Sequence, residues 1–144
     1  MDDFCRKLGY NSILFDAVDK DGNPIYHTNV VMSVGEKFAL LCEDVVISPP
    51  ELSELESNLS SGGRKIVRIS YEQMLHYACN ALEVRNILGD HFLVMSQTAK
   101  DSLNEEQLAV IEESARVLPV RIPHIEEVGG GSARCMLAEV VRST

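Results

Sequence analysis

Apolar and polar positions along this chain repeat with a shift of 53 or 54 residues. Residues 35–38 (GEKF) and 89–92 (GDHF) each open an apolar run, and a shift of 53 aligns 67–69 (VRI) with 120–122 (VRI). Periods of this size are typical of proteins built from stacked or radial repeats. We therefore expect copies of one supersecondary unit.

The first unit is predicted to contain two strands, a helix and a third strand. Residues 30–34 and 38–42 are short apolar runs joined by a turn that contains glycine. Ser48 predicts the N-cap of a helix in which Glu51 completes a capping box, and residues 65–69 follow as the next strand. The buried face of this helix is expected to consist of Leu52, Leu55 and Leu59.

The second unit uses different residues for the same roles. Asn104 is expected to cap its helix, with Gln107 completing the capping box. Its apolar stripe is predicted to consist of Leu108, Ile111, Ala115 and Leu118. The pattern predicts an α/β protein made of β-β-α-β units.

The repeats divide one domain-sized chain, 1–144. A helix ending at Leu8 and a strand at 13–15 are interpreted as the tail of an earlier unit. The predicted organisation is a tail at about 1–18, full units at about 25–70 and 79–123, and a closing cysteine segment at 126–141.

Composition narrows the classes of partner. A net charge of −9 and a pI near 4.8 argue against nucleic acid or an anionic membrane as the main partner, and they are compatible with a positively charged small molecule. No stretch approaches the length of a membrane span, and the first residues lack the pattern of a signal peptide. A cytoplasmic location is therefore expected.

The four cysteines show no CxxC pairing or metal-finger spacing. Cys5, Cys42 and Cys79 lie among apolar or helical neighbours, where a small buried side chain is expected. Cys135 differs because three consecutive glycines precede it and Arg134 adjoins it. Two interpretations stay open for it: a buried cysteine in a last strand, or a reactive thiol at which another molecule can approach the bare backbone.

His27 gains interest from the repeat. A shift of 53 places it on Asn80, and a further shift of 55 places Asn80 on Cys135. If the units surround an axis, these three positions are equivalent and can face one central cavity. A satisfied structural histidine is the alternative.

Two motifs carry a resemblance to a known family. PIYHTNVVM at 24–32 and GGGSARCMLAEV at 129–140 resemble the histidine and cysteine motifs of arginine-deiminase-related proteins. These proteins belong to the guanidino-group-modifying (amidinotransferase, pentein) superfamily, and the citrulline hydrolase (ureidase) type is the branch that the chain resembles. The stretches YNSILFDAVDKDGNPIYHTN and LVMSQTA extend the similarity through nearly the whole chain.

The resemblance implies a five-bladed α/β propeller of β-β-α-β units around a central site. It implies that Cys135 is the nucleophile and His27 the general acid and base in hydrolysis of a C–N bond of a guanidino or ureido group. No metal and no organic cofactor is implied. The expected substrate-binding residues are Asn29, Asn80, Arg134 and Ser132. Asn80 follows from the repeat, and Arg134 and Ser132 follow from their proximity to Cys135.

The chain departs from the family pattern at Asn29, where arginine-type relatives have an acidic residue that grips the guanidinium. An amide can donate to and accept from a neutral urea, so the expected substrate group is ureido, as in citrulline. Family members are also about twice as long as this chain, which resembles their C-terminal half. A homo-oligomer or a complementing N-terminal half is therefore an expected partner.

Two other functions stay open. A non-catalytic remnant or binding module of the same fold would need neither Cys135 nor His27. A cysteine peptidase or amidase would need an oxyanion hole, which the backbone of Gly130 and Gly131 would have to supply.

Overall fold

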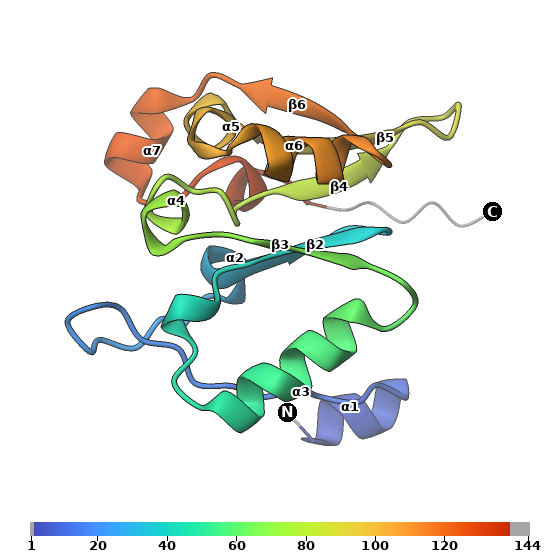
Figure 1. Ribbon diagram of the computed structural model, residues 1–144, viewed down its shortest axis with the longest axis vertical. Helices are drawn as coiled ribbons and strands as arrows, with labels where there is room; N and C mark the ends of the chain where they lie inside the picture. Colours follow the sequence, from blue (N-terminus) through green and yellow to red (C-terminus); the bar gives the residue numbers. More distant parts are fainter. Residues whose placement is uncertain (1, 139–144) are drawn as a thin grey trace.

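Two three-stranded sheets with the same topology organise the protein (Figure 1), of which the computed structural model describes residues 2–138. In each sheet the first strand pairs antiparallel with the second, and the second pairs parallel with the third. The strands are β1 (Met32–Val34), β2 (Phe38–Leu41) and β3 (Lys65–Arg68) in one sheet, and β4 (Leu82–Arg85), β5 (His91–Ser96) and β6 (Arg116–Val120) in the other. The structure confirms a mixed α/β fold with small sheets, while the five-bladed propeller stays a prediction.

Helix α3 (Pro49–Ser60) connects the parallel strands of the first sheet. The Ser48 side chain caps it by accepting a hydrogen bond from the Glu51 amide, as expected. The rest of the predicted capping box is wrong, because the Glu51 carboxylate accepts a 3.0 Å bond from the Asp16 amide instead. Leu55 and Leu59 are buried as predicted, and Leu52 is partly buried.

Helices α5 (Gln97–Ser102) and α6 (Glu105–Glu112) connect the parallel strands of the second sheet. The predicted capping box of Asn104 and Gln107 is present in full. The predicted apolar stripe is wrong at Leu118, which lies in β6 and is 46% exposed. The helix ends before this residue, and the alternation of a strand then turns Leu118 outward while Val117 packs on the core.

Two predicted strands differ from the structure. Residues 30 and 31 belong to a short helix, α2 (Thr28–Val31), so β1 begins only at Met32. The predicted strand at 13–15 is absent, and the nearby chain forms only isolated bridges, Ala17 with Val46 and Val18 with Pro24. Val31 is buried although it is helical, so packing on the core overrides its preference for a strand.

One hydrophobic core spans both sheets. All four residues of β2 are buried, and they share a cluster with Leu93 and Met95 of β5 and Ile111 of α6. Helix α6 packs against both β3 and β6. Polar contacts also join the units: Lys65 pairs with Glu113 at 2.6 Å, and the side chains of Gln73 and Gln107 exchange hydrogen bonds.

Cys42 and Cys79 lie in this core, as the sequence predicted. Burial raises the pKa of the Cys42 thiol to about 11, with a contribution from the nearby Asp44 charge. Burial also raises the pKa of Cys79 far above its ordinary value. Both thiols are therefore protonated and unreactive near neutral pH. Cys5 is only partly buried.

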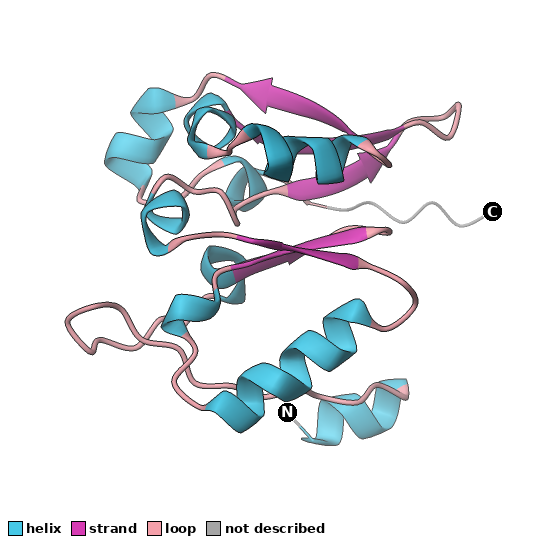
Figure 2. Ribbon diagram, viewed as in Figure 1, coloured by secondary structure: helices cyan, strands magenta, loops and turns pink. Residues whose placement is uncertain are grey.

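The remaining helices include α1 (Asp2–Leu8) beside α3, and α4 (Tyr71–Leu75) and α7 (Pro123–Gly129) at one end of the sheets (Figures 1 and 2). The 3-10 turns are η1 (Glu43–Val45) and η2 (Ala133–Met136). The end that carries α4 and α7 also carries α2 and η2, and it positions the candidate site. No helix in the range 2–138 is long and apolar enough to cross a bilayer.

Candidate active site

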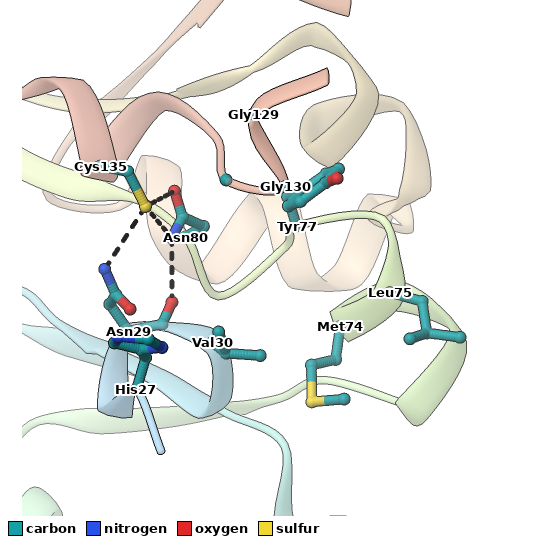
Figure 3. A pocket seen from close by; sticks show the side chains of 11 residues that line it. His27, Asn29, Val30, Met74, Leu75, Tyr77, Asn80, Gly129, Gly130 and Cys135 are labelled. Carbon is teal, nitrogen blue, oxygen red and sulfur yellow. Dashed lines mark hydrogen bonds between the residues drawn. The ribbon is translucent and has the colours of Figure 1, made fainter. Parts of the chain in front are cut away.

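A cavity of about 420 Å³ opens where α2, α4, α7 and η2 meet (Figure 3). Its polar lining includes His27, Asn29, Asn80 and Cys135, and Gly129, Gly130 and Gly131 also line it. Val30, Met74 and Leu75 form an apolar side opposite the cysteine loop, with Tyr77 between them and the glycines. The residues that the repeat aligns, His27, Asn80 and Cys135, thus share one cavity.

Helix α2 presents His27 and Asn29 to this cavity. His27 is the N-cap residue, with extended backbone, and its carbonyl accepts a 3.0 Å hydrogen bond from the Val30 amide. The His27 side chain is exposed, and it makes no side-chain hydrogen bond within the described part of the chain. The ring is therefore free to meet a bound molecule.

Asn80 is held in place by an unusual turn after α4. Tyr77 has the left-handed backbone conformation, φ +64°, which costs a non-glycine residue of the order of 1 kcal/mol. The Tyr77 carbonyl accepts a 2.8 Å bond from the Asn80 amide, and its hydroxyl donates to the Glu126 carbonyl at 3.1 Å. These bonds hold the turn that brings the buried Asn80 beside the cavity.

The Asn80 side chain joins three parts of the site. Its Nδ2 donates to the Asn29 carbonyl oxygen and to Cys135 Sγ, both at 3.3 Å. Its Oδ1 accepts a 3.1 Å bond from the Arg134 amide. One amide therefore fixes α2 against η2 and sets the position of the sulfur.

Cys135 lies in η2, is exposed, and has partners for either protonation state of the thiol. As a thiol it can donate to Asn80 Oδ1 at 3.6 Å. As a thiolate it accepts from the Nδ2 groups of Asn80, at 3.3 Å, and of Asn29, at 3.7 Å (Figure 3). Two amide donors can stabilise negative charge on sulfur, which is the nucleophilic form of cysteine.

Two of the glycines before Cys135 occupy positions where a side chain would be unfavourable, for different structural reasons. Gly130 ends α7 in the left-handed conformation, φ +64°, which favours glycine. A Cβ on Gly131 would lie 3.1 Å from Cys135 Sγ and 3.3 Å from its Cβ. The close approach of the loop to the sulfur therefore favours glycine at 131, because a methyl group would displace the sulfur slightly.

Ser132 does not line the cavity, although the sequence suggested a substrate contact. It is fully buried, and its hydroxyl donates a 2.6 Å hydrogen bond to Glu126 Oε1. Thr98 donates to Glu126 Oε2 at 2.8 Å, so this buried carboxylate ties α5 and α7 to the segment before Cys135. Burial alone would raise the pKa of Glu126, but hydrogen bonds from Ser132, Ser96 and Thr98 outweigh it and the pKa lies below its ordinary value.

Arg134 contacts the site through its backbone. Its side chain lines a neighbouring hollow of about 330 Å³ together with Thr28 and Met32. From the sequence alone, an ion pair with Glu139 is an alternative role for Arg134, but Glu139 lies outside the described residues. Within 2–138 the cavity lining itself contains no carboxylate and no basic side chain besides the imidazole of His27.

Sequence reasoning missed Glu126, Tyr77 and the apolar side of the cavity. Glu126 follows His124 and Ile125 in a stretch that has the pattern of a solvated helix. No local sequence signal predicts the left-handed backbone conformation of Tyr77, because this conformation is typical of glycine and asparagine and not of tyrosine.

The fold and the family match place the chain in the pentein superfamily, and a cysteine and a histidine line one cavity at the end of its two sheets. The chain belongs to the eukaryotic N,N-dimethylarginine dimethylhydrolase family, whose sequence profile matches residues 1–142. No match was found among curated proteins.

Solved structures of cyanobacterial arginine dihydrolase share the fold. The N-terminal domain of ArgZ bound to product gives a TM-score of 0.69 at 14% identity, covering 93% of this chain and 44% of that one. Apo ArgZ gives 0.66 at 16% identity, covering 92% of this chain and 19% of ArgZ. AgrE in complex with ornithine and NAD⁺ gives 0.61 at 16% identity, covering 88% and 17%. The chain therefore spans less than half the length of the proteins it resembles in structure.

Proposed function

We propose that the site hydrolyses a C–N bond of a ureido or guanidino group on a small amino acid, through a covalent intermediate on Cys135. The observation that carries this proposal is the exposed sulfur between two amide donors, on a cavity that His27 also lines. Family membership supports the reaction class. So does a solved structure of an ArgZ variant with a covalently bound reaction intermediate.

In the proposed mechanism the Cys135 thiolate attacks the central carbon of the group, and the C–N bond to the departing nitrogen breaks. His27 gives that nitrogen a proton, so that it leaves as ammonia or an amine. The carbon stays bonded to sulfur. His27, now neutral, removes a proton from water, whose oxygen attacks the carbon and expels the Cys135 thiolate.

The amides have a proposed role in recognition. Because the described lining holds no carboxylate, a cationic guanidinium would lose water without gaining a counter-charge. A neutral urea can accept from Asn29 Nδ2 and donate to its Oδ1. We therefore expect a ureido group to be preferred, as in citrulline.

The relatives bind cationic amino acids: structures of ArgZ and AgrE variants hold substrate and L-arginine, respectively. Asn29 is therefore the residue to test. A chain with Asn29→Asp should gain activity on arginine relative to citrulline, because the new carboxylate supplies the missing counter-charge.

The experiment measures release of ammonia and amine from citrulline, arginine, dimethylarginine and agmatine by the purified chain, at several protein concentrations. Cys135→Ala and His27→Gln are expected to lose turnover by at least about a hundredfold. Undiminished turnover by Cys135→Ala would contradict the proposal. Much faster turnover of arginine than of citrulline by the intact protein would contradict the ureido preference.

A second candidate is a non-catalytic binding module of the same fold. The chain spans only 44% of the ArgZ N-terminal domain, which favours a site that needs further residues. Binding of citrulline without turnover, unchanged in Cys135→Ala, would support this candidate.

A further inference from the structure

A second group of chemically active side chains lies away from the cavity. Glu36 in the β1–β2 turn, Glu83 in β4 and His91 at the start of β5 converge where the two sheets meet. This junction is at the opposite end of the sheets from α4 and α7 (Figure 1). The three residues come from both sheets, so only the folded chain brings them together.

The three side chains are already close enough to share one ligand. One ligand atom of each residue lies within 4.8 Å of the corresponding atoms of the other two. His91 Nδ1 contacts Glu83 Oε1, and His91 Nε2 lies 3.7 Å from Glu36 Oε2. Glu83 Oε2 accepts a 2.8 Å bond from the Glu36 amide, which holds the turn against β4. Each carboxylate therefore faces the imidazole.

The space at the junction is preserved by the backbone. The three side chains line a hollow of about 230 Å³, with Gly35 at its edge. A Cβ on Gly35 would collide with Glu83 Oε2 and come within 2.9 Å of the Phe38 ring. Glycine at this position lets the carboxylate reach the turn.

The donor set at the junction suits a cation. The Glu83 side chain is only 10% exposed, and within the described residues its only ion-pair partner is His91. Glu36 and Glu83 place two carboxylates beside one imidazole, while Lys37 Nζ lies 3.9 Å from Glu36 Oε1 and Arg85 also lines the hollow. Two carboxylates and an imidazole suit Zn²⁺ and similar divalent transition metals, whereas Mg²⁺ and Ca²⁺ prefer oxygen ligands alone.

We propose that Glu36, Glu83 and His91 form a divalent transition-metal site, with Zn²⁺ as its natural ion, that clips the two sheets together. Ligand atoms around a tetrahedral Zn²⁺ are about 3.4 Å apart at its usual bond lengths, so movements of about 1 Å bring these three to the ion. Water completes the coordination. The ring nitrogen that ligates the ion is neutral.

The test titrates Co²⁺, a spectroscopic substitute for Zn²⁺, into the chain carrying Cys135→Ala, which removes the cavity thiol. One equivalent should bind with visible d–d bands and without the intense near-ultraviolet band of a cobalt–thiolate bond. Zn²⁺ should displace it and raise the melting temperature by several degrees. Because this background lacks the proposed nucleophile, the result is independent of the proposed hydrolysis.

Glu36→Gln and His91→Gln should each weaken Co²⁺ binding at least tenfold. Glu36 is half-exposed, so its variant is expected to fold, and circular dichroism checks this. His124→Gln removes an exposed imidazole in α7 and should leave binding unchanged. The proposal would be overturned if Co²⁺ did not bind or if a cobalt–thiolate band appeared. It would also be overturned if the Glu36 and His91 variants bound Co²⁺ as tightly as the Cys135→Ala chain does.

Discussion

At the scale of single residues, the Asn80 side chain contacts α2, η2 and the Cys135 sulfur through one amide. The two atoms of this amide have different roles. Nδ2 donates a hydrogen bond that can stabilise negative charge on the sulfur, whereas Oδ1 accepts a hydrogen bond from the Arg134 amide. A carboxylate at this position keeps the acceptor and loses the donor.

We therefore expect Asn80→Asp to slow alkylation of Cys135 by iodoacetamide about tenfold at neutral pH, since a negative charge beside sulfur disfavours the thiolate. The rate is measured by mass spectrometry of the Cys135 peptide. Asn58→Asp adds the same charge on the exposed face of α3 and should leave the rate unchanged. Equal rates in the two variants would contradict the role given to Asn80.

Gly130 and Gly131 offer a matched pair of alanine substitutions. Gly131→Ala should displace the sulfur by a few tenths of an ångström and change the alkylation rate severalfold, because the new methyl group meets Cys135. Gly130→Ala meets no neighbour but is strained at φ +64°, so it should lower the free energy of unfolding by about 1 kcal/mol. Urea unfolding and alkylation separate the two effects. The loop geometry would be contradicted if Gly130→Ala changed the alkylation rate and Gly131→Ala lowered only the free energy of unfolding.

At the scale of elements, Glu126 links α7, α5 and the segment that carries Cys135. Its pKa is lower in the folded protein than in the unfolded chain, where the ordinary value is 4.5. Its ionised form therefore stabilises the fold fully above the unfolded pKa. That stability is lost as the pH falls through the folded pKa.

Glu126→Gln should lower the free energy of unfolding by about 1–3 kcal/mol at pH 7, because an amide leaves one hydroxyl without its acceptor. The difference from the unmodified protein should shrink as the pH falls from the ordinary pKa of 4.5 through the lower pKa of the folded state, where Glu126 becomes protonated. Urea unfolding between pH 2.5 and 7 measures this. A difference that stays constant over that range would exclude the ionised carboxylate as the cause.

Local sequence rules predicted those elements whose signals are local. The caps at Ser48 and Asn104 depend on residues three positions apart, and both are present. Helix α2 was missed because its valines favour strands and only packing makes them helical. Glu126 was missed because its burial comes from α5 and the cysteine segment, which are distant in sequence.

At the scale of the whole molecule, the repeat shift carried more information than any single motif. It aligned His27, Asn80 and Cys135, which the structure places on one cavity, although their chemical roles stay predictions. The repeat shift did not predict which large apolar side chains would be exposed to solvent. A row of large apolar side chains near α1 is more than half exposed: Phe4, Leu8, Tyr10 and Leu14.

These exposed side chains predict association of the purified chain. Light scattering during size-exclusion chromatography should show a mass that rises with concentration, and the pair Tyr10→Ser with Leu14→Ser should reduce it. Ile87→Ser, at the tip of the β4–β5 hairpin, removes a side chain that is 98% exposed and serves as the control. A monomer at every concentration would contradict this prediction.

Mass spectrometry of the protein, quenched in acid during exposure to citrulline and to arginine, tests whether Cys135 forms the covalent intermediate. We expect a covalent adduct on the Cys135 peptide, absent in Cys135→Ala and in chains that were not given substrate. Product release without any adduct, continuing in Cys135→Ala, would show that this cysteine is not the nucleophile.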